Sequence, residues 1–421
     1  MKILGIETSC DETAAAVVED GKRLLSNVVL SSMDLHAAYG GVVPEIAARS
    51  HIESIIPVIE KALADAFSLE NGGKRLEVRD NSPNSNLSTP SSTSDPWDQI
   101  DGIAVTYGAG LGGSLLVGVM TARTLAITKN KPLYAVNHVE SHIYANFLTE
   151  TSPSLSTSYQ LPTTNPKFPM LGLIVSGGHS QIVLWRDHFD YTLLGQTRDD
   201  AIGEAFDKVA KIIGLPYPGG PSISEYAKKG DPHKFKFPKA KVNSVSPALE
   251  KLRNEMQATS TLRHNSNGRS FASGRTGVAQ GAGYDYSFSG VKTAVLRAAQ
   301  ELIGEDHHFP SHKLSERLSD TQKADIAASF QRIAVETVVD KLVEAFDEFQ
   351  PKSVVIGGGV AANTELRRQL ADRLPLPIEY TDMKLCTDNG AMIATLGCYK
   401  VALNQPAADP FTLDIAPNLS M

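Results

Sequence analysis

One strand–turn–strand pattern occurs twice in this chain of 421 residues, first in residues 4–18 and again in residues 171–185. Each copy has an apolar segment, a short turn rich in small and hydroxyl-bearing residues, and a second apolar segment. A turn without bulky side chains allows a phosphate to approach the backbone N–H groups closely. The repeated hairpin therefore predicts two related lobes with a nucleotide held between them.

The composition is typical of a globular protein, with 42% hydrophobic and 21% charged residues. A chain of this length fits two domains. No apolar stretch reaches the roughly 20 residues of a membrane helix. Because a strand is expected directly after Met1, we expect neither a signal nor a transit peptide. The three cysteines are too few for a disulfide framework and lack zinc spacing, so we expect a cytoplasmic protein.

The net charge of −7 is unevenly distributed along the chain. Residues 228–275 contain eleven basic and three acidic side chains, which leaves a local charge of +8. Such a segment favours binding of a polyanion such as RNA, although a solvated loop without a partner explains the same composition. The basic side chains are Lys228, Lys229, Lys234, Lys236, Lys239, Lys241, Lys251, Arg253, Arg263, Arg269 and Arg275.

Outside the two hairpins, the hydrophobic periodicity predicts alternating strands and helices. The expected strands are 24–30, 101–107, 132–136 and 353–356. The expected helices are 44–67, one that ends near residue 128, one that begins at residue 138, and 198–213, 321–349, 363–374 and 388–403. This alternation predicts an α/β protein whose mixed sheets are flanked by helices.

Three polar segments interrupt the pattern, at residues 71–96, 149–166 and 242–283. Segments rich in Asn, Ser, Pro and Gly bury too little apolar surface to order themselves, so we interpret all three as loop insertions. We expect an N-terminal lobe of residues 1–137 and a C-terminal lobe of residues 138–421. The last helix could pack back on the first lobe.

A candidate metal site begins with His138 and His142, which lie four residues apart and share one face of the predicted helix. Polar helix positions without a ligand are the alternative. Asp388, at the start of the last helix, supplies a possible third ligand, although its position also suits a helix N-cap. Two imidazoles and a carboxylate with open positions suit Fe²⁺, Mn²⁺ or Zn²⁺. Glu140 is not placed as in the H-E-x-x-H peptidase motif.

Candidate nucleotide contacts lie farther along the chain. Residues 354–363 form a buried strand, a turn of three glycines and a helix start, a pattern compatible either with a nucleotide contact or with an ordinary tight turn. Asn363 can donate to and accept from an adenine edge or a ribose. Asp207 could accept from ribose hydroxyls or pair with Lys211. Residues 217–221 form a turn whose glycine backbone could face a ribose.

These motifs resemble, in order, those of the bacterial-type tRNA N6-adenosine threonylcarbamoyltransferases, formerly called O-sialoglycoprotein endopeptidases. Ala109 stands where that family usually has proline, and the three insertions fall outside the resemblance. The matching stretches are residues 5–13, 36–45, 138–142, 175–179, 203–208, 217–221, 287–293, 358–363 and 386–392.

The resemblance implies a two-lobed actin-like ATPase fold. It also implies transfer of a threonylcarbamoyl group from threonylcarbamoyl-adenylate to N6 of adenosine 37 in tRNAs that read codons beginning with A. The implied partners are tRNA, a paralogous subunit of the same fold and a small P-loop ATPase; no membrane is implied.

The resemblance also assigns residues. The metal ligands are His138, His142 and Asp388. Asp11 and Glu12 are implicated in catalysis. For the cofactor we expect one divalent metal, Fe²⁺ first and Zn²⁺, Mn²⁺ or Mg²⁺ as alternatives. The adenylate-binding residues are Ile174, Val175, Ser176, Gly177, Gly178, Asp207, Gly220 and Asn363.

Three other functions remain open at this point. A small-molecule kinase of the same superfamily would consume ATP without tRNA. A non-catalytic paralogous scaffold would not need the group formed by His138, His142 and Asp388. A metallopeptidase is disfavoured by the position of Glu140. The hypothesis preferred here requires the two histidines and the distant carboxylate to meet in the cleft between the lobes, beside a bound adenylate.

Overall fold

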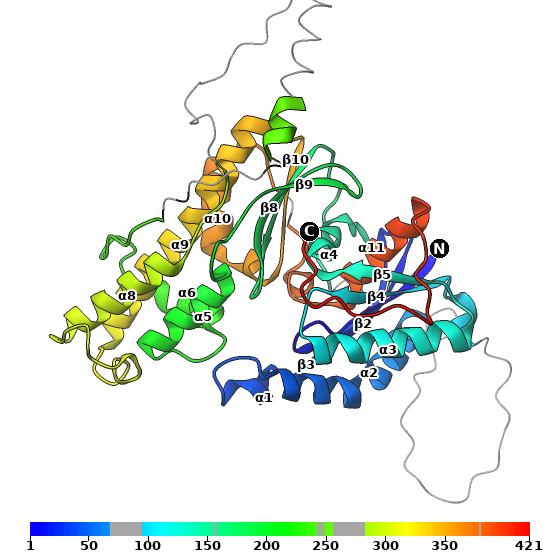
Figure 1. Ribbon diagram of the computed structural model, residues 1–421, viewed down its shortest axis with the longest axis horizontal. Coiled ribbons are helices and arrows are strands. Elements are labelled where there is room, and N and C mark those ends of the chain that lie inside the picture. The colour runs from blue at the N-terminus through cyan, green and yellow to red at the C-terminus, as the bar shows by residue number, and fades with distance from the viewer. Residues whose placement is uncertain are drawn as a thin grey trace, which may run out of the picture. The chain divides into compact units, whose positions relative to one another are not determined.

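The computed structural model describes residues 1–67, 95–153, 155, 158–240, 242, 247, 249–255, 283–378 and 380–421. Most of the expected insertions at residues 71–96 and 242–283 lies outside these residues. The chain forms two compact units, each described by itself below (Figure 1). Unit 1 comprises Met1–His36, Val42–Asn165 and Asp388–Met421, and unit 2 comprises Ala37–Gly41 and Pro166–Thr387.

Unit 1 contains a six-stranded mixed sheet with the strand order β5-β4-β1-β2-β3-β6. The first three strands form an antiparallel meander, and β4 runs parallel to β1 on the other side. The short β6 adds to the edge next to β3, within the segment 149–166 that was expected to be only a loop. The strands are β1 (Lys2–Glu7), β2 (Glu12–Glu19), β3 (Arg23–Ser31), β4 (Gly102–Gly108), β5 (Leu133–Asn137) and β6 (Glu150–Thr151).

Helices cover both faces of this sheet (Figure 1). Because side chains alternate along a strand, Leu4 and Ile6 of β1 join the core beneath α2 (Pro44–Phe67) and α3 (Gly112–Lys129). Gly5 faces α11 (Gly390–Ala402) on the opposite side. The remaining helical segments are α1 (Met33–Ala37), η1 (Pro96–Gln99), α4 (His138–Tyr144) and η2 (Ala145–Phe147).

The chain therefore returns to unit 1 at its end. The last helix, α11, packs against β1 and β2, the arrangement that the sequence left open. The division between the units falls after Asn165, whereas we expected it at residue 137. The physical reason is that α4 continues directly from β5 and packs against α11, so it remains with the first sheet.

Unit 2 contains a four-stranded sheet with the order β10-β7-β8-β9. Its strands repeat β4-β1-β2-β3 in both order and direction, because β7, β8 and β9 are antiparallel and β10 runs parallel to β7. This repeat confirms the mixed α/β fold class predicted from the duplicated hairpin. The strands are β7 (Met170–Val175), β8 (Ser180–Asp187), β9 (Asp190–Gln196) and β10 (Ser353–Gly357).

The unit 2 helices and sheet share one hydrophobic core. Helix α9 begins with a capping box between Ser319 and Gln322, and α5 ends at Gly214 in the left-handed conformation. Helix α5 begins at Ile202, four residues later than expected. The helical segments are α5 (Ile202–Ile213), α6 (Gly219–Ala227), α8 (Ser289–Leu302), η3 (Ser311–Lys313), α9 (Asp320–Phe349), η4 (Gly359–Ala362), α10 (Thr364–Arg373) and η5 (Met383–Leu385).

Within the described part of the chain, every helix is too short or too polar to cross a membrane.

Candidate metal centre and glycine-rich turns

The two histidines are presented by α4, which begins directly at the end of β5. The side chain of Asn137 caps this helix by accepting hydrogen bonds from the backbone N–H groups of Val139 and Glu140. His138 and His142 are one helical turn apart, and their ring centroids are 4.7 Å apart. Both imidazoles are buried. The local sequence thus places two nitrogen donors on one face of a short, capped helix.

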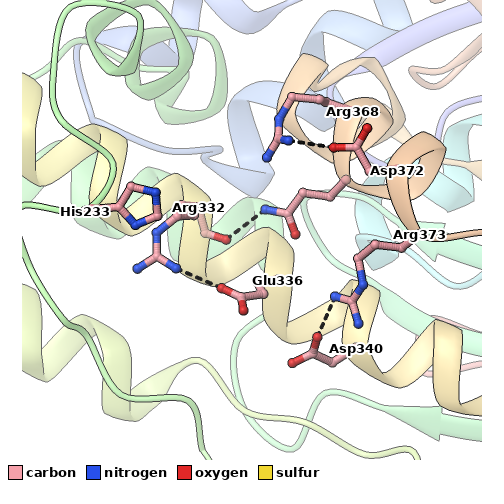
Figure 2. Close-up of a pocket in the computed structure, with 8 residues that line it drawn as sticks. His233, Arg332, Glu336, Asp340, Arg368, Asp372 and Arg373 are labelled. Atoms are coloured by element: carbon pink, nitrogen blue, oxygen red, sulfur yellow. Dashed lines mark hydrogen bonds and ion pairs between the residues drawn. The ribbon is translucent and has the colours of Figure 1, made fainter.

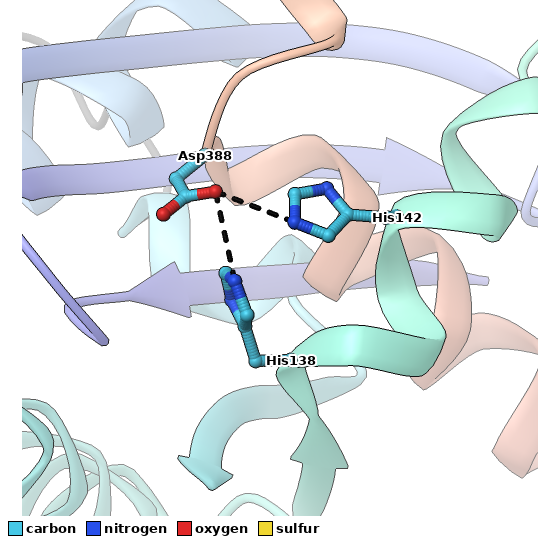
Figure 3. Close-up of side chains that lie close together, drawn as sticks. All are labelled: His138, His142 and Asp388. Carbon is cyan, nitrogen blue, oxygen red and sulfur yellow. Dashed lines mark ion pairs between the residues drawn. The ribbon is translucent and has the colours of Figure 1, made fainter. Parts of the chain in front are cut away.

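Asp388 completes the group from the other end of the chain (Figure 3). Its Oδ1 lies 3.6 Å from Nε2 of His138 and 3.5 Å from Nε2 of His142. The residue that caps α11 is Asn389, whose side chain accepts from the N–H of Met392. The capping role considered for Asp388 was therefore wrong. The next residue caps the helix, so the carboxylate of Asp388 points to the histidines.

The chemistry of this donor set fits a divalent metal. One ligand atom from each of His138, His142 and Asp388 lies within 4.8 Å of the others. Burial raises the pKa of Asp388 to about 6, against the opposing effect of His138. Burial lowers the pKa of His138, but Asp388 and Glu7 outweigh it and raise this pKa to about 9. Two imidazoles and a buried carboxylate are ligands typical of Fe²⁺, Mn²⁺ and Zn²⁺ sites.

A carboxylate that we did not predict as a site residue, Glu7, supports the first histidine. Its Oε2 lies 3.1 Å from Nδ1 of His138 and accepts from the hydroxyl of Thr106 at 2.6 Å. Its Oε1 accepts from the backbone N–H of Ser9. Burial raises the pKa of Glu7, but His138 and the other two donors hold it below its ordinary value. A charged residue closing the apolar strand β1 was the available sequence signal.

The two acids implicated in catalysis lie where the β1–β2 turn ends: Asp11 is in the turn and Glu12 is the first residue of β2. Burial, followed by the charges of Asp388 and Asp11, raises the pKa of Glu12 to about 10. The hydroxyl of Ser31 donates to Glu12 at 3.5 Å. The structure thus brings both acids into the electrostatic neighbourhood of Asp388.

Glu140 lies between the two histidines in sequence but outside the three-ligand group. It is buried, and burial raises its pKa to about 7, partly offset by the charge of Lys400 on α11. Glu140 thus feels the charge of Lys400, and it lies at a helix position expected to face away from its two histidine neighbours.

In unit 2, the turn between β7 and β8 is built by Ser176 and two glycines. The backbone N–H of Ser176 donates to the carbonyl of His179, and the Ser176 hydroxyl accepts from the His179 N–H. A Cβ added at Gly177 or Gly178 would meet no atom within 4 Å. The start of α5 packs close behind, because a Cβ on Gly203 would lie 2.7 Å from the Ser176 carbonyl oxygen. The turn is therefore supported from behind and open at its glycines.

Asp207 connects two helices of this region. Its Oδ1 accepts from the N–H of Gly219 at 2.6 Å, which ties α5 to the start of α6. Burial raises the pKa of this carboxyl, while the same hydrogen bond lowers it. A Cβ on Gly220 would meet no atom within 4 Å. Asp207 thus holds the glycine turn in place, a role that the sequence did not predict.

Asn363 also serves a structural role that its sequence context did not reveal. Its Oδ1 caps α10, and its amide nitrogen donates to Ser224 and Gln331. The preceding glycine turn approaches β7 closely, since Gly358 has φ +93° and its Cβ would lie 2.4 Å from the Val175 carbonyl oxygen. In this structure the amide therefore links α6, α9 and α10 beside the β7–β8 turn.

Part of the basic segment is described, and two of its cations are bound to α9. Lys239 forms ion pairs with Glu336 and Asp340. Arg253 forms a bidentate pair with Glu348. These two charges are neutralised within unit 2, which weakens the case for them as part of an RNA surface. Lys241, Arg263, Arg269 and Arg275 lie outside the described residues.

A cavity of about 390 Å³ lies against α9 and α10 (Figure 2). Its charged side chains pair with one another: Arg332 with Glu336, Arg368 with Asp372, and Arg373 with Asp340. Because the positive charges are already balanced, this cavity does not form an anion site of its own. The remaining lining residues are His233 and Gln369.

Together these features define a mixed α/β protein with a candidate mononuclear metal centre in one unit and open glycine turns in the other. The tRNA N6-adenosine threonylcarbamoyltransferase family matches residues 23–70 and 93–395. A protein of that name from Thermomicrobium roseum is 43% identical over 95% of this chain and 92% of its own length. Another from Caldicellulosiruptor saccharolyticus is 38% identical over 100% of this chain and 98% of its own. The chain belongs to this family.

Among solved structures, component A of (R)-2-hydroxyglutaryl-CoA dehydratase from Acidaminococcus fermentans is similar with a TM-score of 0.40 and 14% identity. The match covers 96% of this chain and 99% of that one.

Proposed function

We propose that this protein transfers the threonylcarbamoyl group from threonylcarbamoyl-adenylate to N6 of adenosine 37 in tRNAs that read codons beginning with A. The observation that carries the proposal is family membership over nearly the whole chain, with relatives named tRNA N6-adenosine threonylcarbamoyltransferase. The meeting of His138, His142 and Asp388 supports it, because a non-catalytic scaffold would not need this buried group.

His138, His142 and Asp388 hold one divalent metal, Fe²⁺ in the first place and Zn²⁺, Mn²⁺ or Mg²⁺ as alternatives. When bound, the metal supplies a Lewis acid that polarises or holds oxygens of the activated group. The protein's own contribution is a rigid and largely dry ligand set, with Asn137 capping the histidine helix and Asn389 leaving the Asp388 carboxylate available.

The adenylate is bound by unit 2. The open turn formed by Ser176, Gly177 and Gly178, at the end of β7, offers the backbone N–H groups of its two glycines to the phosphate, while the Ser176 N–H donates to the carbonyl of His179. Ile174 and Val175 place that turn, and Gly220 leaves room for a ribose beside it. Asp207 and Asn363 support the surrounding backbone through the hydrogen bonds that each makes within the unit.

In the transfer, N6 of adenosine bonds to the carbonyl carbon while the bond from that carbon to the adenylate phosphate oxygen breaks, so AMP leaves. The step needs positioning and a route for a proton. The N6 amine of adenosine is a weak nucleophile because its lone pair is delocalised into the ring, so correct placement against the carbonyl is essential. Asp11 or Glu12 accepts the proton that the amine releases; Glu12 can do so only when ionised, a state that a cation at the neighbouring metal site would favour. Their support is their place at the end of the β1–β2 turn, where the charge of Asp388 acts on Glu12.

The protein acts in the cytoplasm on tRNA, together with a paralogous subunit of the same fold and a small P-loop ATPase. The support for these partners is the family's motif pattern in the sequence.

The test is reconstitution. The purified full chain and the two proposed partners are incubated with threonylcarbamoyl-adenylate and unmodified tRNA, and the tRNA is digested and analysed by mass spectrometry for the adenosine adduct. A parallel reaction contains ATP and metabolites without tRNA. Adduct formation that depends on this chain supports the proposal. ATP consumption without tRNA, and no adduct with it, contradicts the proposal and favours a kinase.

A further inference from the structure

The carboxylate of Glu7 is fully buried at the end of β1, yet it is not one of the three proposed metal ligands. Three groups approach its two oxygens: the backbone N–H of Ser9 at Oε1, and the hydroxyl of Thr106 and Nδ1 of His138 at Oε2. An ionised carboxylate accepts hydrogen bonds and cannot donate them. The imidazole nitrogen that faces Glu7 must therefore carry a proton.

We propose that Glu7 is a positioning residue that holds His138 in the tautomer with Nδ1 protonated. The other ring nitrogen, Nε2, then presents its lone pair towards Asp388, 3.6 Å away, and towards a cation held with His142. The inference rests on the metal site of the proposed function. It adds to that site a buried acceptor that orients the first ligand, as outer carboxylates do for metal-bound histidines in general.

The environment of Glu7 makes a glutamine substitution informative. The backbone N–H of Ser9 can only donate, so in Glu7→Gln the amide oxygen must face Ser9. The amide NH₂ group then faces Thr106 and His138. The hydroxyl of Thr106 can adapt by accepting. His138 can accept only by moving its proton to Nε2, the nitrogen that the metal needs.

A second acceptor near Nδ1 sets the size of the effect. The hydroxyl of Ser9 lies 3.1 Å from Nδ1 of His138 and can partly retain the proton there. Ser9→Ala alone should weaken metal binding less than Glu7→Gln, because the carboxylate remains. The double variant removes both acceptors and should weaken binding most.

Thr106→Val is the matched control. It removes one hydrogen bond from the same oxygen of Glu7 but leaves the acceptor for His138 in place. If Glu7 served only in folding, Glu7→Gln and Thr106→Val would have similar metal affinities once the difference in their stabilities is taken into account. A positioning role would separate them.

The experiment measures zinc affinity of the full chain by competition with a chromogenic chelator, alongside thermal unfolding of each variant. Glu7→Gln is expected to lower the affinity about 10-fold to 100-fold. Thr106→Val is expected to change it by less than about fivefold, the net worth of one hydrogen bond. Equal affinities for Glu7→Gln and the unchanged protein would overturn the inference.

Nitrogen NMR of the zinc-loaded, ¹⁵N-histidine-labelled protein gives a readout that does not require a Glu7 variant to fold. The signals of His138 are assigned from their loss in His138→Asn. We expect Nδ1 of His138 to be protonated and Nε2 to be bound to zinc; zinc on Nδ1 would overturn the inference.

His142→Ala separates this inference from the proposed metal site. Loss of zinc binding in His142→Ala, with normal affinity in Glu7→Gln, would leave the metal site intact and reject only the role of Glu7. Unchanged zinc binding in His142→Ala would reject the metal site itself and the inference with it.

Discussion

The two hairpin turns of this protein share a backbone plan and differ in chemistry. Both occupy the same place in sheets of the same order and direction, β4-β1-β2-β3 and β10-β7-β8-β9. The turn in unit 1 is flanked by Glu7 and Glu12 and includes Asp11, whereas the turn in unit 2 contains Ser176, Gly177 and Gly178. One scaffold therefore presents carboxylates in one unit and open backbone in the other.

The electrostatic contrast extends beyond the turns. In unit 1, burial and neighbouring acids raise the pKa values of Glu12 and Asp388, a pattern that a bound cation would relieve. In unit 2, burial raises the pKa of Glu348, but the hydrogen bonds from Arg253 and Tyr284 outweigh burial and lower it. The two similar frames thus differ in the side chains at their turns, which are carboxylates in unit 1 and a serine with two glycines in unit 2.

The strongest test of this contrast removes the unit 1 carboxylate that meets both histidines. Asp388→Asn should reduce metal content and tRNA modification by about 100-fold or more, because a metal ligand matters at least as much as the residues behind it. Metal analysis and mass spectrometry of the tRNA measure both quantities.

The control is the neighbouring residue. Asn389→Ala should cost about 1 kcal/mol of stability through loss of the α11 cap, with metal content retained. A metal-free Asn389→Ala protein, or a metal-replete Asp388→Asn protein, would break the distinction drawn between these two positions.

A second test addresses the open turn of unit 2. Gly178→Val should fold normally, because a Cβ there meets no atom within 4 Å. It should weaken adenylate binding by more than about 10-fold, equivalent to about 1.4 kcal/mol, since the side chain blocks approach to the backbone. Calorimetry with a non-hydrolysable adenylate analogue measures this.

Gly203→Ala serves as its counterpart. Its Cβ would lie 2.7 Å from the Ser176 carbonyl oxygen, so it should cost about 1–3 kcal/mol in the free energy of unfolding. Normal adenylate affinity in Gly178→Val would show that the turn is not the phosphate site.

The smallest expected effect concerns Glu348, an acid of unit 2 whose charge is neutralised by Arg253. Glu348 accepts two hydrogen bonds from Arg253 and one from Tyr284, so Glu348→Gln should cost about 1 kcal/mol at neutral pH. The pKa of Glu348 is lowered on folding, so its contribution is present above the unfolded value and is lost as pH falls through the folded one.

Urea unfolding at several pH values checks this prediction. The stability difference between Glu348→Gln and the unchanged protein should shrink as the pH falls below about 4.5, the ordinary glutamate value. A difference that grows on acidification would contradict the sign of the shift.

Much of the local structure could be predicted from the sequence. The helix at Pro44–Phe67 was predicted with its observed bounds, because a proline–glutamate start and a long apolar stripe mark it clearly. That His138 and His142 share one helix face likewise follows from their four-residue spacing and helix geometry alone. The start of α5 was predicted four residues too early, and β6 was missed inside the expected loop at residues 149–166.

The roles of individual polar side chains were harder to predict. Asp388 and Asn389 are adjacent and both suit a helix cap, so the local sequence does not separate them. Asp207 and Asn363 hold neighbouring helices together through partners on other elements, 12 and 32 residues away in the chain. Each of these roles depends on which distant group arrives at the side chain.

Periodicity over a few residues was enough to predict the repeated hairpin, the alternation of strands and helices, and the pair of imidazoles on one helix face. The contact of Asp388 with that pair, and the place of Glu7 behind it, depend instead on packing between segments far apart in the chain. Gly5 and Gly390 allow this, since a Cβ on Gly5 would lie 2.4 Å from the Gly390 carbonyl oxygen. That close approach of α11 to β1 joins the two ends of the chain.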